Sequence, residues 1–237
     1  MIFGSAWLII SPLISVIYQT IVFGVIAGIP TEGVPRPIFY LTSNILWGFF
    51  ASVINGNSNT FTGNAGLFGK IYFPRMVVPI SNLITVAFDF LIQLGLLFCL
   101  MLGYSLWGGY KINFNWTIIF IPIYLLHLGI LGVGVGILIS SLTTKYRDLI
   151  PLVGYVITLW QYLSPVVYTT DLIPEKFRNI YMLNPVTPVL MAFKNSILGI
   201  EYNNTKYMGI SLCIAICIFT IGLILFNQIE KTFMDTV

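Results

Sequence analysis

The sequence has very few charged residues for its length. Only 8% of its 237 residues are Asp, Glu, Lys or Arg, against roughly 25% in a soluble domain. Eleven basic and eight acidic residues leave a net charge of +3, which is too sparse to cover a water-exposed surface. Hydrophobic residues make up 57%. A soluble globule, a disordered chain and a nucleic-acid-binding protein with a basic patch are therefore excluded, and we expect an integral membrane protein.

Residues that catalyse reactions or bind metals are also scarce. His127 is the single histidine, and no Cys, His or acidic residue follows it at metal-ligand spacing. The three cysteines lie in apolar runs, and three cannot form a closed disulfide framework. The sequence contains no G-x-S-x-G nucleophile elbow. We therefore expect no enzymatic site, no metal site and no cofactor in this chain.

A nucleotide-binding motif is missing as well. Residues 66–71 read GLFGKI and resemble the end of a phosphate-binding loop. The first glycine of that motif would fall at Asn64, and Ile71 replaces the Ser or Thr that binds Mg²⁺. Any ATP-driven work must come from a separate subunit that binds ATP and Mg²⁺.

Long apolar runs are what the sequence has in abundance. A helix that crosses the hydrocarbon core needs about 20 mostly apolar residues. The predicted fold is an all-α integral membrane protein, a single domain over residues 1–237 with six transmembrane helices. The candidate spans are residues 6–28, 38–54, 77–102, 116–142, 149–167 and 207–227.

Basic residues in the loops only partly decide the orientation. The segments on the side of the termini hold five of them, Lys70, Arg75, Lys145, Arg147 and Lys231. The opposite segments hold six, Arg36, Lys111, Lys176, Arg178, Lys194 and Lys206. The short loops favour cytoplasmic termini, because each short loop on the side of the termini carries two basic residues and each short loop on the other side carries one.

Residues 168–206 form an unusual segment before the last span. Residues 172–177 (LIPEKF) suggest a short amphipathic helix with a proline at its first turn. Asn184-Pro185 marks a turn, and the apolar stretch after it is too short to span a membrane. We predict a re-entrant or interfacial helical hairpin, because irregular backbone at membrane depth must be shielded by protein. An ordinary extracellular loop is the alternative.

Small and polar residues inside the spans favour helix packing. Gly132 and Gly136, with Gly129 beside them, match the pattern that lets helix backbones approach closely. Asp89 lies near the middle of the third span with Gln93 one turn later, which predicts a buried polar pair. A proton relay is the alternative, but it would want a second ionisable group within the spans.

Two spans carry polar and aromatic residues together. In the first span three of these residues recur at i, i+4 and i+7, so they share a helical face. Aromatic rings with nearby hydroxyls suit sugars, whereas an interhelical seam is the other interpretation. The candidates for lining a substrate pathway are Ser11, Ser15, Tyr18, Tyr155, Thr158, Trp160 and Tyr162.

Several motifs together resemble the membrane subunits of ABC polysaccharide exporters. These type-2 permeases move lipid-linked O-antigen, capsule or teichoic-acid chains. The resemblance covers essentially the whole chain in order and spacing. The motifs are KIYFPR (70–75), VPISN (78–82), YRDL (146–149), SPVVY (164–168), LIPE (172–175) and NP (184–185).

The resemblance implies an architecture and a set of partners. It implies six spans with both termini in the cytoplasm of a bacterial inner membrane, and a homodimer with a pathway lined by the first and fifth spans. It also implies two copies of a cytoplasmic ATP-binding subunit and a lipid-linked polysaccharide as substrate. The candidates for coupling to the ATPase are Lys70, Arg75, Lys145, Tyr146, Arg147 and Asp148. Arg147 could instead be a snorkelling anchor at the membrane surface.

One departure and two alternatives stay open. The resemblance implies a basic amphipathic helix before the first span, whereas Met1 stands almost directly against that span. Either the start is truncated, or coupling proceeds without that helix. An exporter of a drug, peptide or small lipid is one alternative function. An ATP-independent channel or secondary transporter is the other, although no convincing internal repeat supports it.

Overall fold

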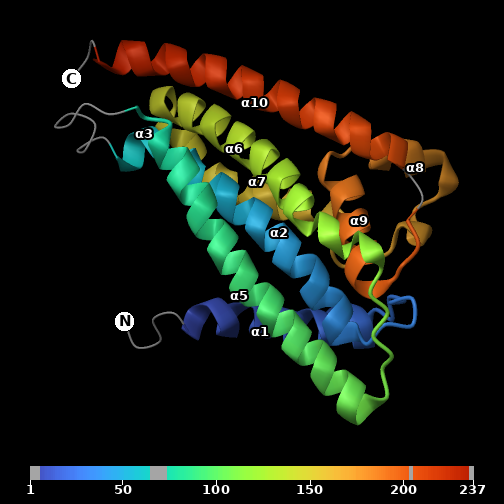
Figure 1. Ribbon diagram of the computed structural model, residues 1–237. Helices are drawn as coiled ribbons and strands as arrows, with labels where there is room; N and C mark the ends of the chain where they lie inside the picture. The colour runs from blue at the N-terminus through green and yellow to red at the C-terminus, as the bar shows by residue number, and fades with distance from the viewer. Residues whose placement is uncertain (1–5, 65–73, 203–204, 235–237) are drawn as a thin grey trace.

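The computed structural model describes residues 6–64, 74–202 and 205–234, and all regular structure within these ranges is helical. Figure 1 shows the helices as a single elongated bundle. In chain order they are α1 (Trp7–Gln19), a π-helix (Thr20–Ile26), α2 (Arg36–Ser58), α3 (Thr60–Gly63), α5 (Val77–Gly108), a 3₁₀ turn (Trp116–Phe120), α6 (Ile121–Lys145), a 3₁₀ turn (Arg147–Leu149), α7 (Ile150–Tyr162), a 3₁₀ turn (Thr170–Leu172), α8 (Glu175–Met182), α9 (Val186–Leu198) and α10 (Thr205–Met234).

Five helical segments of the described chain are long and apolar enough to cross a membrane. They coincide with five of the six expected spans, so the prediction of an all-α membrane protein is confirmed. These segments are Trp7–Ile26, Arg36–Ser58, Val77–Gly108, Trp116–Thr144 and Thr205–Ile229.

The fifth expected span, residues 149–167, is shorter than its apolar run suggests. Helix α7 has 13 residues, which at 1.5 Å per residue is about 20 Å. It ends at Tyr162, and the apolar residues that follow turn back into the protein and are buried from Ser164 to Val167. Pro165 has no N–H with which to continue a helix, which explains why this apolar run stops being helical.

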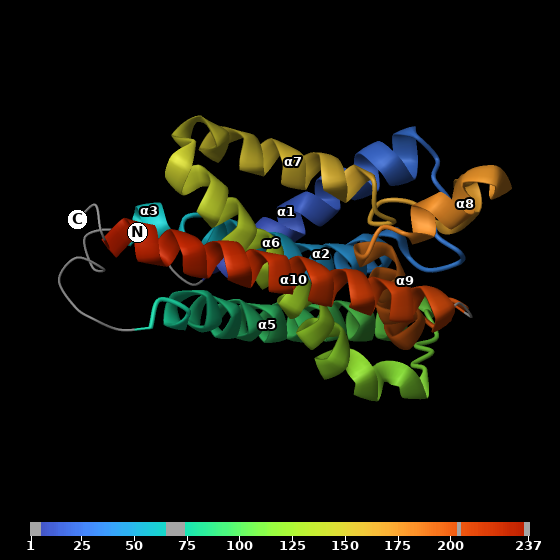
Figure 2. The same ribbon diagram turned by 90° about the horizontal axis from the view of Figure 1, so that it is seen from above.

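Helix α2 is the centre of the bundle. In its apolar stretch of 18 consecutive residues 72% are buried, against 17% in the corresponding stretch of the span that contains α1. Figure 2 shows α2 and α6 in the middle, α5 on one side and α7 on the other. The helices at the edge, α1 and α7, therefore keep large faces that no other part of the described chain covers.

Glycines bring α6 into close contact with α2. A Cβ atom at Gly132 would lie 2.9 Å from Val53 Cγ1, and one at Gly136 would lie 2.5 Å from Asn57 Cβ. Neither approach leaves room for a side chain. The predicted packing role of these glycines is confirmed.

A second pair of glycines joins α6 to α10. A Cβ atom at Gly134 would lie 2.7 Å from Phe219 Cα, and one at Gly222 would lie 2.7 Å from the carbonyl oxygen of Gly134. These obstacles are backbone atoms, so they cannot move aside as a flexible side chain could. Backbones that approach this closely are typical of small-residue contacts in membrane helices.

The predicted hairpin before the last span is confirmed as a helix pair. Pro174 precedes α8, an eight-residue helix, and Asn184-Pro185 turns the chain into α9. Helix α9 has 13 residues, and twelve of them are buried, so it is shielded by the rest of the described chain. The hairpin lies at the end of the molecule opposite the termini (Figure 1).

The two ends of the bundle differ in what they carry. Both chain ends, α3 and the turn between α6 and α7 lie at one end (Figures 1 and 2). At that end the rings of Phe61 and Phe226 stack with centroids 4.4 Å apart. The opposite end carries α8, the turn after α1 and the end of α5. Cys99, Cys213 and Cys217 are free thiols on the exposed surfaces of α5 and α10.

Candidate functional site

An open cavity of about 610 Å³ lies beside α1. Its walls come from α1, α2, α5 and α7, and much of its lining is hydroxyl, amide and aromatic. The structure brings Ser11, Ser15 and Tyr18 of the predicted polar face to this cavity, with Gln93 of α5 across from them. The other lining residues include Trp7, Gln19, Asn44, Trp47, Ser52 and Gln161.

A pair of amides holds the wall of the cavity together. Gln19 Nε2 donates to Asn44 Oδ1 at 3.2 Å, and Asn44 Nδ2 donates back to Gln19 Oε1 at 2.7 Å. Gln19 is buried, and two reciprocal bonds compensate the cost of burying an amide. This pair fixes α1 against α2 at the depth of the cavity.

The helix beyond Gln19 changes its winding. Residues Thr20–Ile26 form a π-helix, a rare conformation that occurs frequently at functional sites. Gly24 faces α2, where a Cβ atom would lie 2.6 Å from Cδ of Arg36. The wider turn places the last part of the first span against the start of α2.

Three of the predicted residues on α7 lie on its outer face. Tyr155 is 71% exposed and Tyr162 is 49% exposed. Thr158 is also exposed, and its hydroxyl donates to the carbonyl of Gly154 at 2.9 Å. These side chains do not line the cavity of the single chain, whereas their neighbour Gln161 does.

Trp160 faces the opposite way. Its ring packs edge-on against Phe50 of α2 with centroids 5.2 Å apart, and its Nε1 donates to Asn184 Oδ1 at 3.0 Å. Asn184 also donates to the carbonyl of Leu163 at 3.1 Å and to Ser164 Oγ at 2.9 Å. Trp160 therefore joins α7 to α2 and to the hairpin, and the structure does not bring it to the cavity.

Asp89 and Gln93 lie one turn apart on α5, and their predicted polar pair stays a prediction. Asp89 is half-buried, and it belongs to a row with Ser81, Thr85 and Gln93 at every fourth position of α5. Gln93 ends this row at the cavity.

The described coupling candidates Tyr146 and Asp148 lie at the end of the bundle that carries α3 and the end of α10. The 3₁₀ turn Arg147–Leu149 links α6 to α7 there, with Tyr146 and Asp148 exposed. Lys70 lies outside the described residues. Lys145 is the last residue of α6 and Arg147 opens the turn, but their side chains are also outside the described part.

Arg75 differs from Tyr146 and Asp148 because it is buried. Its side chain is only 4% exposed, and its guanidinium carbon lies 5.9 Å from the centroid of the Phe61 ring. A cation over an aromatic face is an attractive contact. Arg75 thus fixes the start of α5 to α3 within the chain.

Lys194 lies in the interior of the protein, although the sequence predicts a basic residue in a loop. Its side chain is 1% exposed. Its Nζ donates to the carbonyl of Pro165 at 2.6 Å and lies 4.1 Å from the centroid of the Phe39 ring. Burial lowers the pKa of Lys194 to about 7, and the nearby charge of Glu32 opposes that shift.

The single histidine serves the packing of the interior. Ser211 donates its hydroxyl hydrogen to the carbonyl of Pro185, so His127 Nε2, 3.0 Å from Ser211 Oγ, must be the donor in that contact. These bonds tie α6 to α10 and to the hairpin. Within the described ranges no cluster of three His, Cys, Asp or Glu side chains could hold a metal ion.

Sequence comparison defines the class of this protein. Residues 1–198 match the ABC-2 type transporter family, and the chain belongs to that family. It is therefore a membrane permease of an ABC transporter.

Its relatives are permeases of one kind of system. Over 239 residues the chain is 29% identical to an O-antigen export system permease protein RfbA of Klebsiella pneumoniae, covering 99% of this chain and 87% of that protein. A second RfbA from the same organism is 26% identical, covering 98% and 86%. The O-antigen export system permease protein RfbA of Myxococcus xanthus is 22% identical, covering 81% and 71%.

Several residues of the cavity were missed by sequence reasoning. Asn44, Gly48 and Ser52 recur at every fourth position of α2, and all three line the cavity. This spacing was visible in the sequence, since positions four apart share a helical face. The contact between Gln19 and Asn44 joins positions 25 residues apart, and no local pattern indicates it.

Proposed function

We propose that this chain is the transmembrane subunit of an ATP-driven exporter of a lipid-linked cell-surface polysaccharide. The observation that carries the proposal is the cavity of about 610 Å³ along α1. Hydroxyls and amides inside a membrane bundle are costly to place next to lipid, but together with aromatic rings they suit a chain of sugars. The three O-antigen export permeases among its relatives support this class of cargo.

The pathway lies between two copies of the chain. Helices α1 and α7 expose aromatic and polar side chains along the bundle, including Tyr18, Tyr155 and Tyr162. Pairing two copies through this side would place these rings opposite their counterparts and enclose the cavity. The chain then forms a homodimer whose passage is lined by Ser11, Ser15 and Gln93 together with the exposed face of α7.

Energy comes from a cytoplasmic ATP-binding subunit, two copies per dimer. The turn between α6 and α7 and the start of α5 form the contact surface, because they lie at the same end of the bundle as α3 and the end of α10. This end lies on the cytoplasmic side of a bacterial inner membrane. Exposed Asp148 supplies a charge that fixes the register of that contact, and buried Arg75 transmits movement into α5.

The test uses the double variant Tyr155→Ala/Tyr162→Ala in cells that lack the native gene. We expect lipid-linked polymer to accumulate inside the cell and surface polysaccharide to fall several-fold, while the ATP-binding subunit still copurifies. Trp116→Ala is the control, because Trp116 is 72% exposed but lies far from α7 in sequence and outside the cavity lining.

Two results would count against the proposal. Normal surface polysaccharide in the double variant would show that α7 does not line the passage. Unchanged surface polysaccharide after deletion of the gene, with a new sensitivity to a drug or peptide, would show that the cargo belongs to another class.

A further inference from the structure

Two clefts meet at the end of α5, away from the termini and from the proposed passage. One is a mainly polar cleft of about 470 Å³ between the turn after α1 and the loop after α5. The other is an apolar groove of about 400 Å³ on α5 itself. Gly108 lines both of them, so the polar cleft and the apolar groove adjoin at the last residue of α5.

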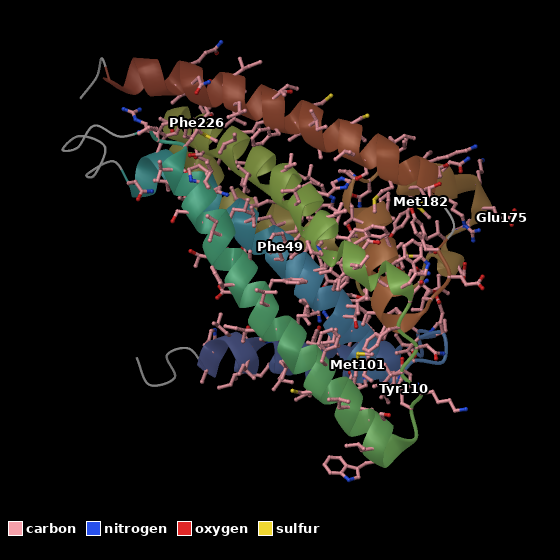
Figure 3. The ribbon with its side chains drawn as sticks, viewed as in Figure 1. Phe49, Met101, Tyr110, Glu175, Met182 and Phe226 are labelled. Carbon is pink, nitrogen blue, oxygen red and sulfur yellow. The ribbon has the colours of Figure 1, made fainter. Side chains whose placement is uncertain are left out.

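The polar cleft contains one side chain of each charge. Glu32 comes from the turn after α1, and Lys111 comes from the loop after α5, with Tyr110 and Asn113 beside it. Figure 3 shows Tyr110 next to the last turns of α5. Burial raises the pKa of Glu32, Asp171 raises it further, and Lys194 opposes both effects. The walls of the cleft thus hold a carboxylate and an ammonium, and both side chains are exposed.

The backbone at Glu32 is held in an unusual conformation. Its φ is +52°, and it is the one residue other than glycine with a positive φ in the described ranges. A left-handed conformation is unfavourable for a residue that carries a side chain, and such strain clusters at binding sites. Gly33 and Gly109, also with positive φ, form the adjoining walls without strain.

The apolar groove has the surroundings of a membrane boundary. It is lined by Leu100, Gly103, Tyr104, Trp107 and Gly108. Trp107 is 91% exposed, and Trp and Tyr are enriched where a bilayer meets water. Helix α5 ends there, because Gly109 takes the left-handed conformation that terminates helices. An occupant of both clefts must be apolar along the helix and polar just beyond its end.

From this juxtaposition we propose that the end of α5 binds a zwitterionic aminophospholipid of the phosphatidylethanolamine class. An acyl chain lies along the groove over Gly103, and the headgroup enters the polar cleft. There Lys111 pairs with the phosphate, Glu32 accepts hydrogen bonds from the primary ammonium, and Tyr110 flanks the headgroup. Charge-assisted hydrogen bonds of this kind are the strong ones.

The charges of the cleft favour this headgroup over the other candidates. A pyrophosphate on a lipid carrier would meet a single ammonium and would be repelled by Glu32. An anionic glycerol headgroup has no cation to offer the carboxylate. A quaternary ammonium has no N–H to donate. The site lies beyond the cavity along α1, so it does not depend on the identity of the cargo.

The experiment measures lipid retention by the purified complex of this chain with its ATP-binding subunit. Native mass spectrometry follows the complex after addition of phosphatidylethanolamine, phosphatidylglycerol or phosphatidylcholine with identical palmitoyl-oleoyl chains, and of farnesyl pyrophosphate as a competitor. We expect phosphatidylethanolamine to be retained several-fold better than the other two lipids. Glu32→Gln removes this preference, and Lys111→Gln lowers retention of all three lipids.

A variant of the groove tests the site separately from the headgroup. A Cβ atom at Gly103 meets nothing within 4 Å, so Gly103→Leu fills the groove without disturbing the fold. It lowers retention of every lipid and leaves their order unchanged. Gly95→Leu is the matched control, because Gly95 lies on the same helix, also faces open space and is not part of the groove.

Three outcomes overturn the proposal. A preference for phosphatidylglycerol would mean that Lys111 alone attracts anions. Displacement by farnesyl pyrophosphate would assign the cleft to a lipid carrier. Equal retention of all lipids, unchanged in Gly103→Leu, would mean that ordinary boundary lipid covers this surface.

Discussion

The ammonium of Lys194 is enclosed by groups from three parts of the chain. The carbonyl of Pro165 accepts its hydrogen bond, the ring of Phe39 lies below it, and the charge of Glu32 acts on it from the turn after α1. The hydrogen bond and the ring contact tie the hairpin to α2 and to the end of α7. Because the group is buried, its protonation and the stability of this contact are linked.

We expect the stability of the protein to depend on pH through Lys194. The folded pKa of about 7 is below the ordinary value of 10.5, so between these values the unfolded chain binds more protons than the folded chain. The free energy of unfolding therefore rises as pH increases from about 7 to 10.5, by up to about 5 kcal/mol for a shift of this size. The stabilisation is fully present above pH 10.5 and is lost as the pH falls to 7.

Lys194→Met isolates this contribution. The measurement is thermal unfolding in detergent, followed by tryptophan fluorescence. The Tm of the variant minus the Tm of the parent protein should be larger at pH 7 than at pH 10. The difference between the two proteins removes the effect of all other titrating groups. An equal difference at both pH values would show that Lys194 is not desolvated.

At the scale of elements, the contact between α6 and α10 depends on two glycines. The carbonyl oxygen of Gly134 would lie 2.7 Å from a Cβ atom at Gly222, so any side chain there must push the helices apart. Helices that associate in lipid rely on such close packing, because lipid is as apolar as their surfaces.

Gly222→Leu should separate α10 from α6. Overpacking typically costs about 1–3 kcal/mol, and the upper part of that range applies here because the obstacle is backbone. Gly209→Leu is the control on the same helix, since a Cβ atom at Gly209 meets nothing within 4 Å. Urea or heat unfolding should show a clear loss of stability for Gly222→Leu and none for Gly209→Leu. Equal stability would contradict the close contact.

Much of this arrangement could be predicted from local patterns. Apolar runs gave five spans, Pro174 and Asn184-Pro185 gave the hairpin, and the spacing of Gly132 and Gly136 gave the packing face of α6. Each of these signals acts within a few residues of the place that it describes. Local spacing also placed three residues of α1 on the face that lines the cavity.

Other features depend on partners far away in the sequence and could not be predicted. Hydropathy does not distinguish a helix from apolar chain that folds back, so the end of α7 at Tyr162 was missed. The sequence predicts that Trp160 lies on a polar face, but its hydrogen bond to Asn184 turns the ring toward the interior. The local sequence around Lys194 predicts an exposed loop residue. Its burial depends on α2 and on the residues after α7, which are distant in the sequence.

At the scale of the whole molecule, the cytoplasmic contact proposed above and the hairpin occupy opposite ends. In the proposed coupling, a movement imposed at the turn between α6 and α7 would reach the other end through α7, because Asn184 of the hairpin binds Trp160 and the two residues that follow α7. Rigid-body displacement of this kind is a common way to couple distant sites.

Asp148→Lys should uncouple ATP hydrolysis from export. Asp148 is exposed on the turn at the proposed ATPase contact, and a like charge placed across an interface is strongly unfavourable. Glu175→Lys makes the same charge reversal on exposed α8 at the opposite end and should leave coupling intact. The measurement is the stimulation of ATPase activity by substrate in reconstituted vesicles. Equal stimulation in both variants would remove this turn from the contact surface.

The three cysteines stand on the outside of α5 and α10, and none lines the cavity. Replacing all three with alanine removes no atom from the interior, so a thiol-free protein should keep the parent fold. A single new cysteine at Ser15 would then be the sole target for a water-soluble maleimide. Its labelling rate, with and without nucleotide, would report directly when water reaches the wall beside α1.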